Sequence, residues 1–308
     1  MTIGLLDEFG RDDIDQVGGK GANLGELVGA GFPIPPAFIV CADEYAEVIA
    51  GVAAGSSNDV YVDAVRDWTP SDEFEAELER CHETLQSSRD EPIVYAVRSS
   101  ATAEDLGDAS FAGQHETYYY VTRDELIPMI RACWASLWSD EAVAYRDTQG
   151  IEHSLVLMAV VVQEMIPSDV SGITFTANPP NGNRDEIVTD ATWGMGAAIV
   201  DGRVTPDHYV VARESKEVTS QRIASKREMV STRRMGDEQR MVRVPQHKWQ
   251  QSCLSDDDLL IATDWALKSE SHFGAPQDLK WAFYGGEYFM LQSRPITTLE
   301  IGRDCSMK

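Results

Sequence analysis

The stretch VYAVRSSATAEDLGDASFAGQHET, Val94 to Thr117, is the most informative part of the chain for fold and function. A short apolar strand is expected over Ile93 to Val97, and it delivers Arg98 into a segment of small residues, hydroxyls and glycines. Such a segment lets the backbone approach a polyphosphate closely, and a guanidinium offers a planar fork of donors to phosphate oxygens. Taken alone, the segment fits an ordinary polar loop equally well, because it lacks the fixed P-loop spacing. The hydroxyls and the unobstructed amide of the segment belong to Ser99, Ser100, Thr102, Ser110 and Gly113.

Four further motifs occur along the chain in a fixed order. They are Val17 to Leu27 (VGGKGANLGEL), Val162 to Met165 (VQEM), Ser171 to Pro179 (SGITFTANP) and Leu291 to Thr297 (LQSRPIT). Together with Val94 to Thr117, these motifs resemble the nucleotide-binding domain shared by phosphoenolpyruvate synthase, pyruvate phosphate dikinase and rifampicin phosphotransferase. The five motifs run through nearly the whole chain, which argues against a chance match.

This resemblance implies an ATP-grasp fold of the α+β class, with two lobes and a nucleotide cleft between them that holds ATP and Mg²⁺. We expect an N-terminal lobe over residues 1–185, a C-terminal lobe over residues 186–300 and a tail over residues 301–308.

Composition describes an ordinary globular protein. The 308 residues are 43% hydrophobic, which is enough to bury a real core, and no apolar run reaches membrane-spanning length. The first ten residues lack a basic segment followed by an apolar core, so nothing marks export. The five cysteines are an odd number, widely spread and without a CxxC pair, which favours reduced thiols in a cytoplasmic protein.

The charge balance is strongly acidic. A formal net charge of -25 argues against binding to nucleic acid or to an anionic membrane, because both need a positive surface. Seven lysines accompany 19 arginines, and acidic residues outnumber basic ones about two to one. We therefore expect a protein of a high-salt cytoplasm, in which salt screens the self-repulsion of the surface. ATP is itself an anion, so a local cluster of Lys20, Arg98 and Arg294 must outweigh this field at short range.

Hydrophobic spacing predicts helices over Lys20 to Ala30, Asp43 to Ala50 and Ser71 to Leu85, with a loop over Gly51 to Asp59. A long helical region is expected from Asp124 onward, and its tryptophans are interpreted as core residues rather than as base-stacking residues. Ser255 and Asp258 form a capping pair before a helix over Leu259 to Ser271.

The run Leu155 to Val162 is continuously apolar and rich in valine, which is typical of a strand buried on both faces. It ends at Gln163 and Glu164. A buried strand that stops at polar side chains and free backbone groups is a natural edge for adenine, whereas a strand end in solvent is the plain alternative. The resemblance favours adenine.

The C-terminal hairpin carries the sharpest chemistry. Strands are expected over Asp278 to Tyr284 and Tyr288 to Arg294, joined by the three residues Gly285, Gly286 and Glu287. A three-residue loop places position 280 opposite 292 and position 278 opposite 294, so Asp278, Lys280, Gln292 and Arg294 share one face. A two-residue loop would slip the register and separate the two pairs.

The hairpin departs from the resemblance at one position. In the relatives a glutamate stands where this chain has Lys280, and that glutamate and the later glutamine hold the Mg²⁺ that bridges the ATP phosphates. A second carboxylate is lost where Gly-x-Gly-Glu reads Gly194 to Ala197. Two interpretations stay open: Lys280 neutralises phosphate charge beside a weaker metal site, or the chain binds nucleotide without turning it over.

The resemblance also implies roles for individual residues. Lys20, Arg98 and Arg294 would hold phosphate and serve catalysis, Gln163 would lie near adenine, and Asp278 with Gln292 would be the metal ligands. The full expected lining is Lys20, Arg98, Gly113, Thr117, Gln163, Asp278, Gln292 and Arg294. His115, although a tempting phosphoryl acceptor, is interpreted as a polar loop residue.

The expected reaction phosphorylates a histidine on a separate carrier protein, with AMP and phosphate as the other products. Residues 299–308 are too few for a carrier domain, so we expect the carrier in a partner protein. The competing hypothesis is a nucleotide-sensing subunit without catalysis.

Overall fold

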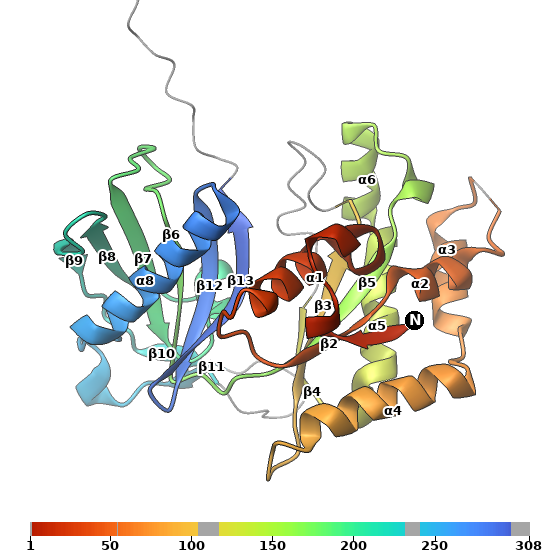
Figure 1. The fold of residues 1–308 in the computed structure, drawn as a ribbon, viewed down its shortest axis with the longest axis horizontal. Coiled ribbons are helices and arrows are strands. Elements are labelled where there is room, and N and C mark those ends of the chain that lie inside the picture. Colours follow the sequence, from red (N-terminus) through yellow and green to blue (C-terminus); the bar gives the residue numbers. More distant parts are fainter. Residues whose placement is uncertain (1, 54, 104–116, 232–240, 297–308) are drawn as a thin grey trace, which may run out of the picture. The chain divides into compact units, whose positions relative to one another are not determined.

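The computed structural model describes residues 2–53, 55–103, 117–231 and 241–296. Two compact units are present. Unit 1 comprises Met1–Gly31 and Pro35–Met165, and unit 2 comprises Phe32–Ile34 and Ile166–Lys308. Both units combine helices with antiparallel sheet, which confirms the α+β class (Figure 1).

Unit 1 is built on a five-stranded sheet in the order β1-β2-β5-β3-β4, in which every paired neighbour is antiparallel. Its strands are β1 (Ile3–Leu5), β2 (Ala37–Val40), β3 (Tyr95–Ala101), β4 (Thr117–Val121) and β5 (Met158–Glu164). Its helices are α1 (Ile14–Gly29), α2 (Ala42–Ile49), α3 (Asn58–Asp67), α4 (Asp72–Gln86), α5 (Leu126–Ala135) and α6 (Asp140–Gln149). Helix α3 was not predicted, and its start falls inside the expected loop over Gly51 to Asp59.

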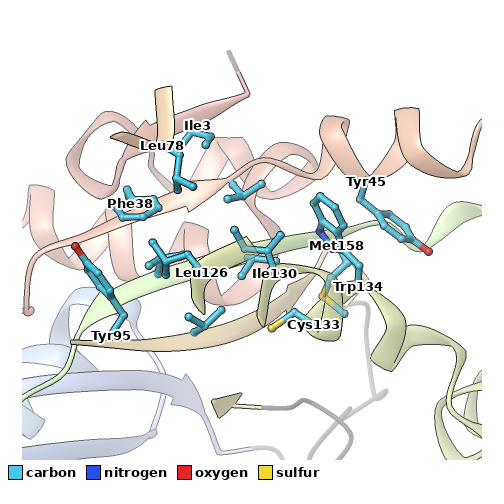
Figure 2. Close-up of a cluster of buried hydrophobic side chains, with 14 of the residues drawn as sticks. Ile3, Phe38, Tyr45, Leu78, Tyr95, Leu126, Ile130, Cys133, Trp134 and Met158 are labelled. Carbon is cyan, nitrogen blue, oxygen red and sulfur yellow. The ribbon is translucent and has the colours of Figure 1, made fainter. Parts of the chain in front are cut away.

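The core of unit 1 lies on one face of this sheet. Figure 2 shows Phe38 and Tyr95 from the strands, Leu78 from α4 and Trp134 from α5 gathered in one apolar cluster. Trp134 is fully buried and Trp138 nearly so. The prediction that these tryptophans are core residues is confirmed, because neither ring is available for stacking on a base.

Two strand predictions need correction. Strand β3 extends to Ala101, so Arg98 lies inside the strand rather than in a loop after it. Strand β5 starts at Met158 and includes Gln163 and Glu164, whereas Leu155 lies in a short 3₁₀ helix and is 70% exposed. The reason is lateral pairing. Gln163 is held opposite residues of both β2 and β3, and this ladder extends the strand past the end of the apolar run.

Unit 2 is built on a six-stranded sheet in the order β13-β12-β6-β7-β8-β9, again with every pair antiparallel. Its strands are β6 (Val170–Phe175), β7 (Glu186–Trp193), β8 (Asp207–Ala212), β9 (Val218–Arg222), β12 (Gln277–Tyr284) and β13 (Glu287–Pro295). The other elements are α7 (Ala197–Val200), α8 (Asp256–Phe273) and the separate ribbon of β10 (Glu228–Val230) and β11 (Met241–Arg243).

Helix α8 covers one face of this sheet (Figure 1). It begins with the predicted capping box, in which Ser255 Oγ accepts from the Asp258 amide at 3.1 Å. Inside the interface, the hydroxyls of Ser269 and Ser293 lie 2.9 Å apart. Side chains alternate between the two faces along a strand. Because Ser293 faces α8, the adjacent residues Gln292 and Arg294 lie on the opposite face of the sheet.

The C-terminal hairpin reaches the predicted pairing by a different route. Its loop has two residues, Gly285 and Gly286, both with positive φ, so the expected three-residue connection is wrong. The loop pairs Tyr284 with Glu287, which by itself would slip the register. A β-bulge with Leu291 as the extra residue restores it, and Lys280 lies opposite Gln292 while Asp278 lies opposite Arg294. The predicted four-residue polar face is therefore confirmed.

The division between the units follows Met165. The expected boundary after residue 185 differs because β6 pairs with β7 on one side and β12 on the other, which joins it to the second sheet. Within the described part of the chain, no helix combines the length and apolarity needed to cross a membrane.

Candidate functional site

Lys20 lies at a break in helix α1. Gly18 has a φ of 69°, and the helix continues from there with Lys20 in its first turn. A Cβ at Gly18 would lie 2.2 Å from the Ser100 carbonyl oxygen, so only glycine allows this approach between α1 and β3. Ser100 Oγ accepts from the Gly21 amide at 3.0 Å and donates to the Val17 carbonyl at 2.8 Å. The sheet thus provides an N-cap to the continued helix, whose N-terminal end favours anions.

The amine of Lys20 is held against the sheet. It donates to the Ser99 carbonyl oxygen, and the side chain is only 9% exposed. A lysine on a surface helix would extend into water instead. The contact therefore favours a positioned cation over the plain alternative of a solvated lysine.

Arg98 and Gln163 form the second polar pair of unit 1. Arg98 Nη1 donates to Gln163 Oε1 at 3.0 Å, and the residues are 8% and 2% exposed. Gln163 Nε2 is buried and has no hydrogen-bond partner in the described part of the chain. A buried donor without an acceptor costs about 1–3 kcal/mol, so a nucleotide that supplies an acceptor there would recover this energy. The residues of unit 1 therefore fit an ATP site.

The remaining residues expected in unit 1 are Thr117 and Gly113. Thr117 lies directly opposite Arg98 in the pairing of β3 with β4, so the structure brings it beside the Arg98 and Gln163 pair. Gly113 and His115 lie outside the described residues.

The end of β5 differs from the expected adenine edge in one respect. Its backbone amides are already bonded, since Glu164 N donates to the Pro36 carbonyl and Met165 N donates to the Val94 carbonyl. Glu164 turns to the other face, where its carboxylate holds Arg89 with bonds of 2.6 and 2.8 Å. Among the described residues at this edge, the Nε2 of Gln163 is the donor that remains without an acceptor.

In unit 2, Asp278 and Arg294 form an ion pair. Both Arg294 Nε and Nη2 contact Asp278 Oδ2, at 2.8 and 2.7 Å. Asp278 Oδ1 is buried and has no hydrogen-bond partner among the described residues. An unpaired carboxylate oxygen is a hard ligand of the kind that Mg²⁺ prefers.

The half-buried Lys280 and Gln292 complete this face. The described residues contain no cluster of three His, Cys, Asp or Glu side chains that could hold a metal ion. Asp278 and Gln292 could offer at most two oxygen ligands to a divalent cation on this face, and the neighbouring ammonium of Lys280 would weaken such a site electrostatically.

The glycine loop after β7 is anchored to β6. Ser171 Oγ donates to the Gly194 carbonyl at 2.6 Å, and Gly194 has a φ of 72° with the Val230 carbonyl 2.6 Å from the position of a Cβ. Ala197 starts α7 at the place where the resemblance implies a carboxylate. A methyl group at Ala197 offers no metal ligand.

Sequence reasoning missed the role of Ser100 as the cap of α1. The two partners are separated by 79 residues, so no local pattern connects them. Ser100 lies beyond the predicted strand Ile93 to Val97, and its hydroxyl was interpreted as part of a polar loop, so no local signal indicated a helix cap.

Comparison with known proteins gives the family. Residues 14–306 match the protein family described as "Pyruvate phosphate dikinase, AMP/ATP-binding domain". Over 98% of its length the chain is 37% identical to the "Probable phosphoenolpyruvate synthase" of Methanocaldococcus jannaschii, and covers 27% of that protein. It is 36% identical over 97% of its length to the phosphoenolpyruvate synthase of Pyrococcus furiosus, with 44% of that protein covered.

A relative with another name matches at a similar identity. The rifampicin phosphotransferase of Streptomyces sviceus is 38% identical over 96% of this chain, which covers 36% of that protein. The chain spans less than half the length of each of these three relatives. Because the match extends over residues 14–306, the chain belongs to the family of pyruvate phosphate dikinase AMP/ATP-binding domains.

Proposed function

We propose that this domain binds ATP and transfers a phosphoryl group to a histidine of a separate carrier protein, with release of AMP and phosphate. The observation that carries the proposal is the buried pair of Arg98 and Gln163. In this pair, Gln163 Nε2 lacks an acceptor within the described chain. Family membership supports the nucleotide, and the names of the relatives support phosphotransfer.

Electrostatics support a phosphate site in unit 1 despite the acidic surface. The cations of Lys20 and Arg98 are both at least nine-tenths buried, so salt screens them far less than it screens the exposed carboxylates. At close range these two positive charges dominate over distant negative ones. We propose that they bind ATP phosphates and that Gln163 Nε2 donates to a ring nitrogen of adenine.

In unit 2 we propose that Arg294 binds phosphate and that Lys280 adds a second positive charge on the same face. Asp278 and Gln292 would hold Mg²⁺, which supplies charge neutralisation to the phosphates when bound. The chain's own residues orient the phosphates, since phosphoryl transfer depends mainly on positioning and charge stabilisation.

The second candidate function is an ATP sensor without turnover. Lys280 and Ala197 favour it, because both stand where a carboxylate ligand is implied. Loss of metal ligands harms the transition state more than the ground state, so binding would persist while transfer stops.

The binding step has a matched pair of variants. Arg98→Met should lower ATP affinity measured by calorimetry by at least about tenfold, since it removes a charged hydrogen-bond donor. Arg89→Met removes the same charge nearby, but Arg89 contacts Glu164 on the other face and should leave affinity unchanged. If both variants lose ATP affinity equally, the loss comes from a general change in the electrostatic field and not from a contact between Arg98 and ATP.

Lys20 offers an independent test, because it is the only lysine before Lys216. Periodate-oxidised ATP, which reacts with nearby amines, should label Lys20 within unit 1, and excess ATP should protect it. Labelling that ATP does not prevent would contradict a nucleotide contact at Lys20.

The transfer step is tested with β-labelled ATP, MgCl₂ and 2 M KCl. The acceptor is the isolated histidine-bearing carrier domain of a phosphoenolpyruvate synthase. Label on the carrier together with AMP supports the enzyme, and tight ATP binding without AMP supports the sensor. Absence of any ATP binding would overturn both functions.

A further inference from the structure

A row of side chains, all polar except Ile173, crosses the face of the unit 2 sheet that α8 does not cover. Successive strand pairings place Gln292, Lys280, Ile173, Asp190, His208 and Arg222 opposite one another, from β13 to β9. Residues that lie opposite across antiparallel strands project from the same face. Asp190, His208 and Arg222 therefore share the face of Lys280 and Gln292, which is opposite to the face that α8 covers.

Asp190 fixes the orientation of the His208 ring. His208 Nδ1 lies 2.8 Å from Asp190 Oδ1, and the two side chains are 32% and 26% exposed. A carboxylate only accepts hydrogen bonds, so in the neutral ring Nδ1 carries the proton and Nε2 carries the lone pair. Nε2 has no hydrogen-bond partner among the residues that the structure describes, and the ring is accessible. This is the arrangement of a nucleophilic or proton-accepting histidine.

Arg222 stands on the other side of the histidine. It lies directly opposite His208 on the edge strand β9 and is exposed. The histidine is thus flanked by a carboxylate that holds its proton and by a guanidinium suited to phosphate oxygens. Lys280 is three strand spacings from His208, about 14 Å between backbones. Two long side chains and a triphosphate chain laid along the row can span this separation.

We propose that His208 is a phosphorylation site, at which Nε2 accepts the terminal phosphoryl group of a nucleoside triphosphate bound on the same sheet face. The Nε2 lone pair forms the bond to the γ-phosphorus, the bond from that phosphorus to the β,γ-bridging oxygen breaks, and its electrons leave with the nucleoside diphosphate. The proton on Nδ1 stays hydrogen-bonded to Asp190. The proposal rests on the proposed ATP binding but assigns an acceptor within this chain.

His153 provides an internal comparison. Its Nε2 lies 2.9 Å from Asp147 Oδ1, and its Nδ1 lies 2.8 Å from Arg146 Nε, which can only donate. Both ring nitrogens are engaged, so His153 has no lone pair available for a phosphorus atom. The two histidines each pair with an aspartate, and only His208 is arranged as a nucleophile.

The test uses two phosphoryl donors on the full chain. Phosphoramidate, a small donor that phosphorylates histidine without a nucleotide site, measures the reactivity of each ring, and γ-labelled ATP measures transfer from bound nucleotide. Mass spectrometry of the acid-labile, base-stable label should locate it on His208 with both donors and not on His153. His208→Asn should bind ATP like the wild type and lose the label from ATP. Arg222→Gln should lower the label by about tenfold, because a charged donor to the phosphoryl oxygens is removed.

The outcomes separate this inference from the proposed function. Wild-type protein that binds ATP in calorimetry and takes no label, or takes it on another residue, overturns the inference and leaves ATP binding intact. Labelling of His208 by phosphoramidate in a chain that binds no ATP overturns both.

Discussion

Gln163 combines two separable roles in one side chain. Its Oε1 accepts from Arg98 Nη1 at 3.0 Å, which is a contact within unit 1, while its Nε2 has no acceptor in the described chain. Two substitutions separate these roles. Gln163→Glu keeps an acceptor for Arg98 and removes the donor, and Gln163→Leu removes both at similar volume.

The expected magnitudes follow from burial. In Gln163→Leu the buried guanidinium of Arg98 loses a charge-assisted bond, which should lower the free energy of unfolding by about 1.5–3 kcal/mol. In Gln163→Glu this bond gains a full negative partner, so stability should change by less than about 1 kcal/mol. If the Nε2 donor contacts bound ATP, its loss should weaken ATP binding by about tenfold in both variants, because a hydrogen bond is worth about 1 kcal/mol and an unsatisfied acceptor costs more.

Urea unfolding and calorimetric ATP titration of the three proteins test this reasoning. The decisive protein is Gln163→Glu, which should be stable and bind ATP weakly. Wild-type ATP affinity in Gln163→Glu would refute the assignment of Nε2 as a ligand donor. Unchanged stability in Gln163→Leu would show that the bond to Arg98 contributes little to the fold.

Further predictions concern helix α1, the metal site, the thiols and salt. Gly18→Ala should destabilise the protein by about 3 kcal/mol in urea unfolding, because it combines a positive φ with a Cβ 2.2 Å from a carbonyl oxygen, whereas Gly29→Ala in the same helix meets no atom within 4 Å and should be neutral or stabilising. Lys280→Glu should make ATP affinity depend more strongly on Mg²⁺ than in the wild type, and the same charge change in Lys268→Glu on α8 should not; equal EDTA sensitivity in the two variants would contradict a metal site at this face. Burial raises the pKa of the Cys41 thiol to about 12 and that of Cys81 to about 11, so iodoacetamide at pH 8 should modify neither before denaturant is added, and rapid native labelling would disprove their burial. The net charge of -25 predicts that the thermal midpoint rises between 0.1 and 2 M KCl, and a midpoint that falls or stays constant would reject the high-salt interpretation.

The sequence by itself determined the features that arise from local periodicity. The two-residue period placed Asp278 with Lys280 on one face of their strand and Gln292 with Arg294 on one face of theirs, and helical spacing marked Trp134 and Trp138 as core. The capping box of α8 could also be predicted from the sequence, because Ser255 and Asp258 are three residues apart. These predictions hold because the governing interactions lie within a few residues along the chain.

Only the tertiary structure decided which distant residues meet. Arg98 contacts Gln163, 65 residues away, and Ser100 donates to the Val17 carbonyl in α1, 83 residues earlier. The hairpin shows the physical reason. A two-residue turn and a bulge at Leu291 each shift the register by one, and only their sum returns Gln292 to Lys280. Each turn or bulge changes which residues of the next strand lie opposite. The row that joins Lys280 to Asp190 and His208 is therefore formed only when all of these strands have paired.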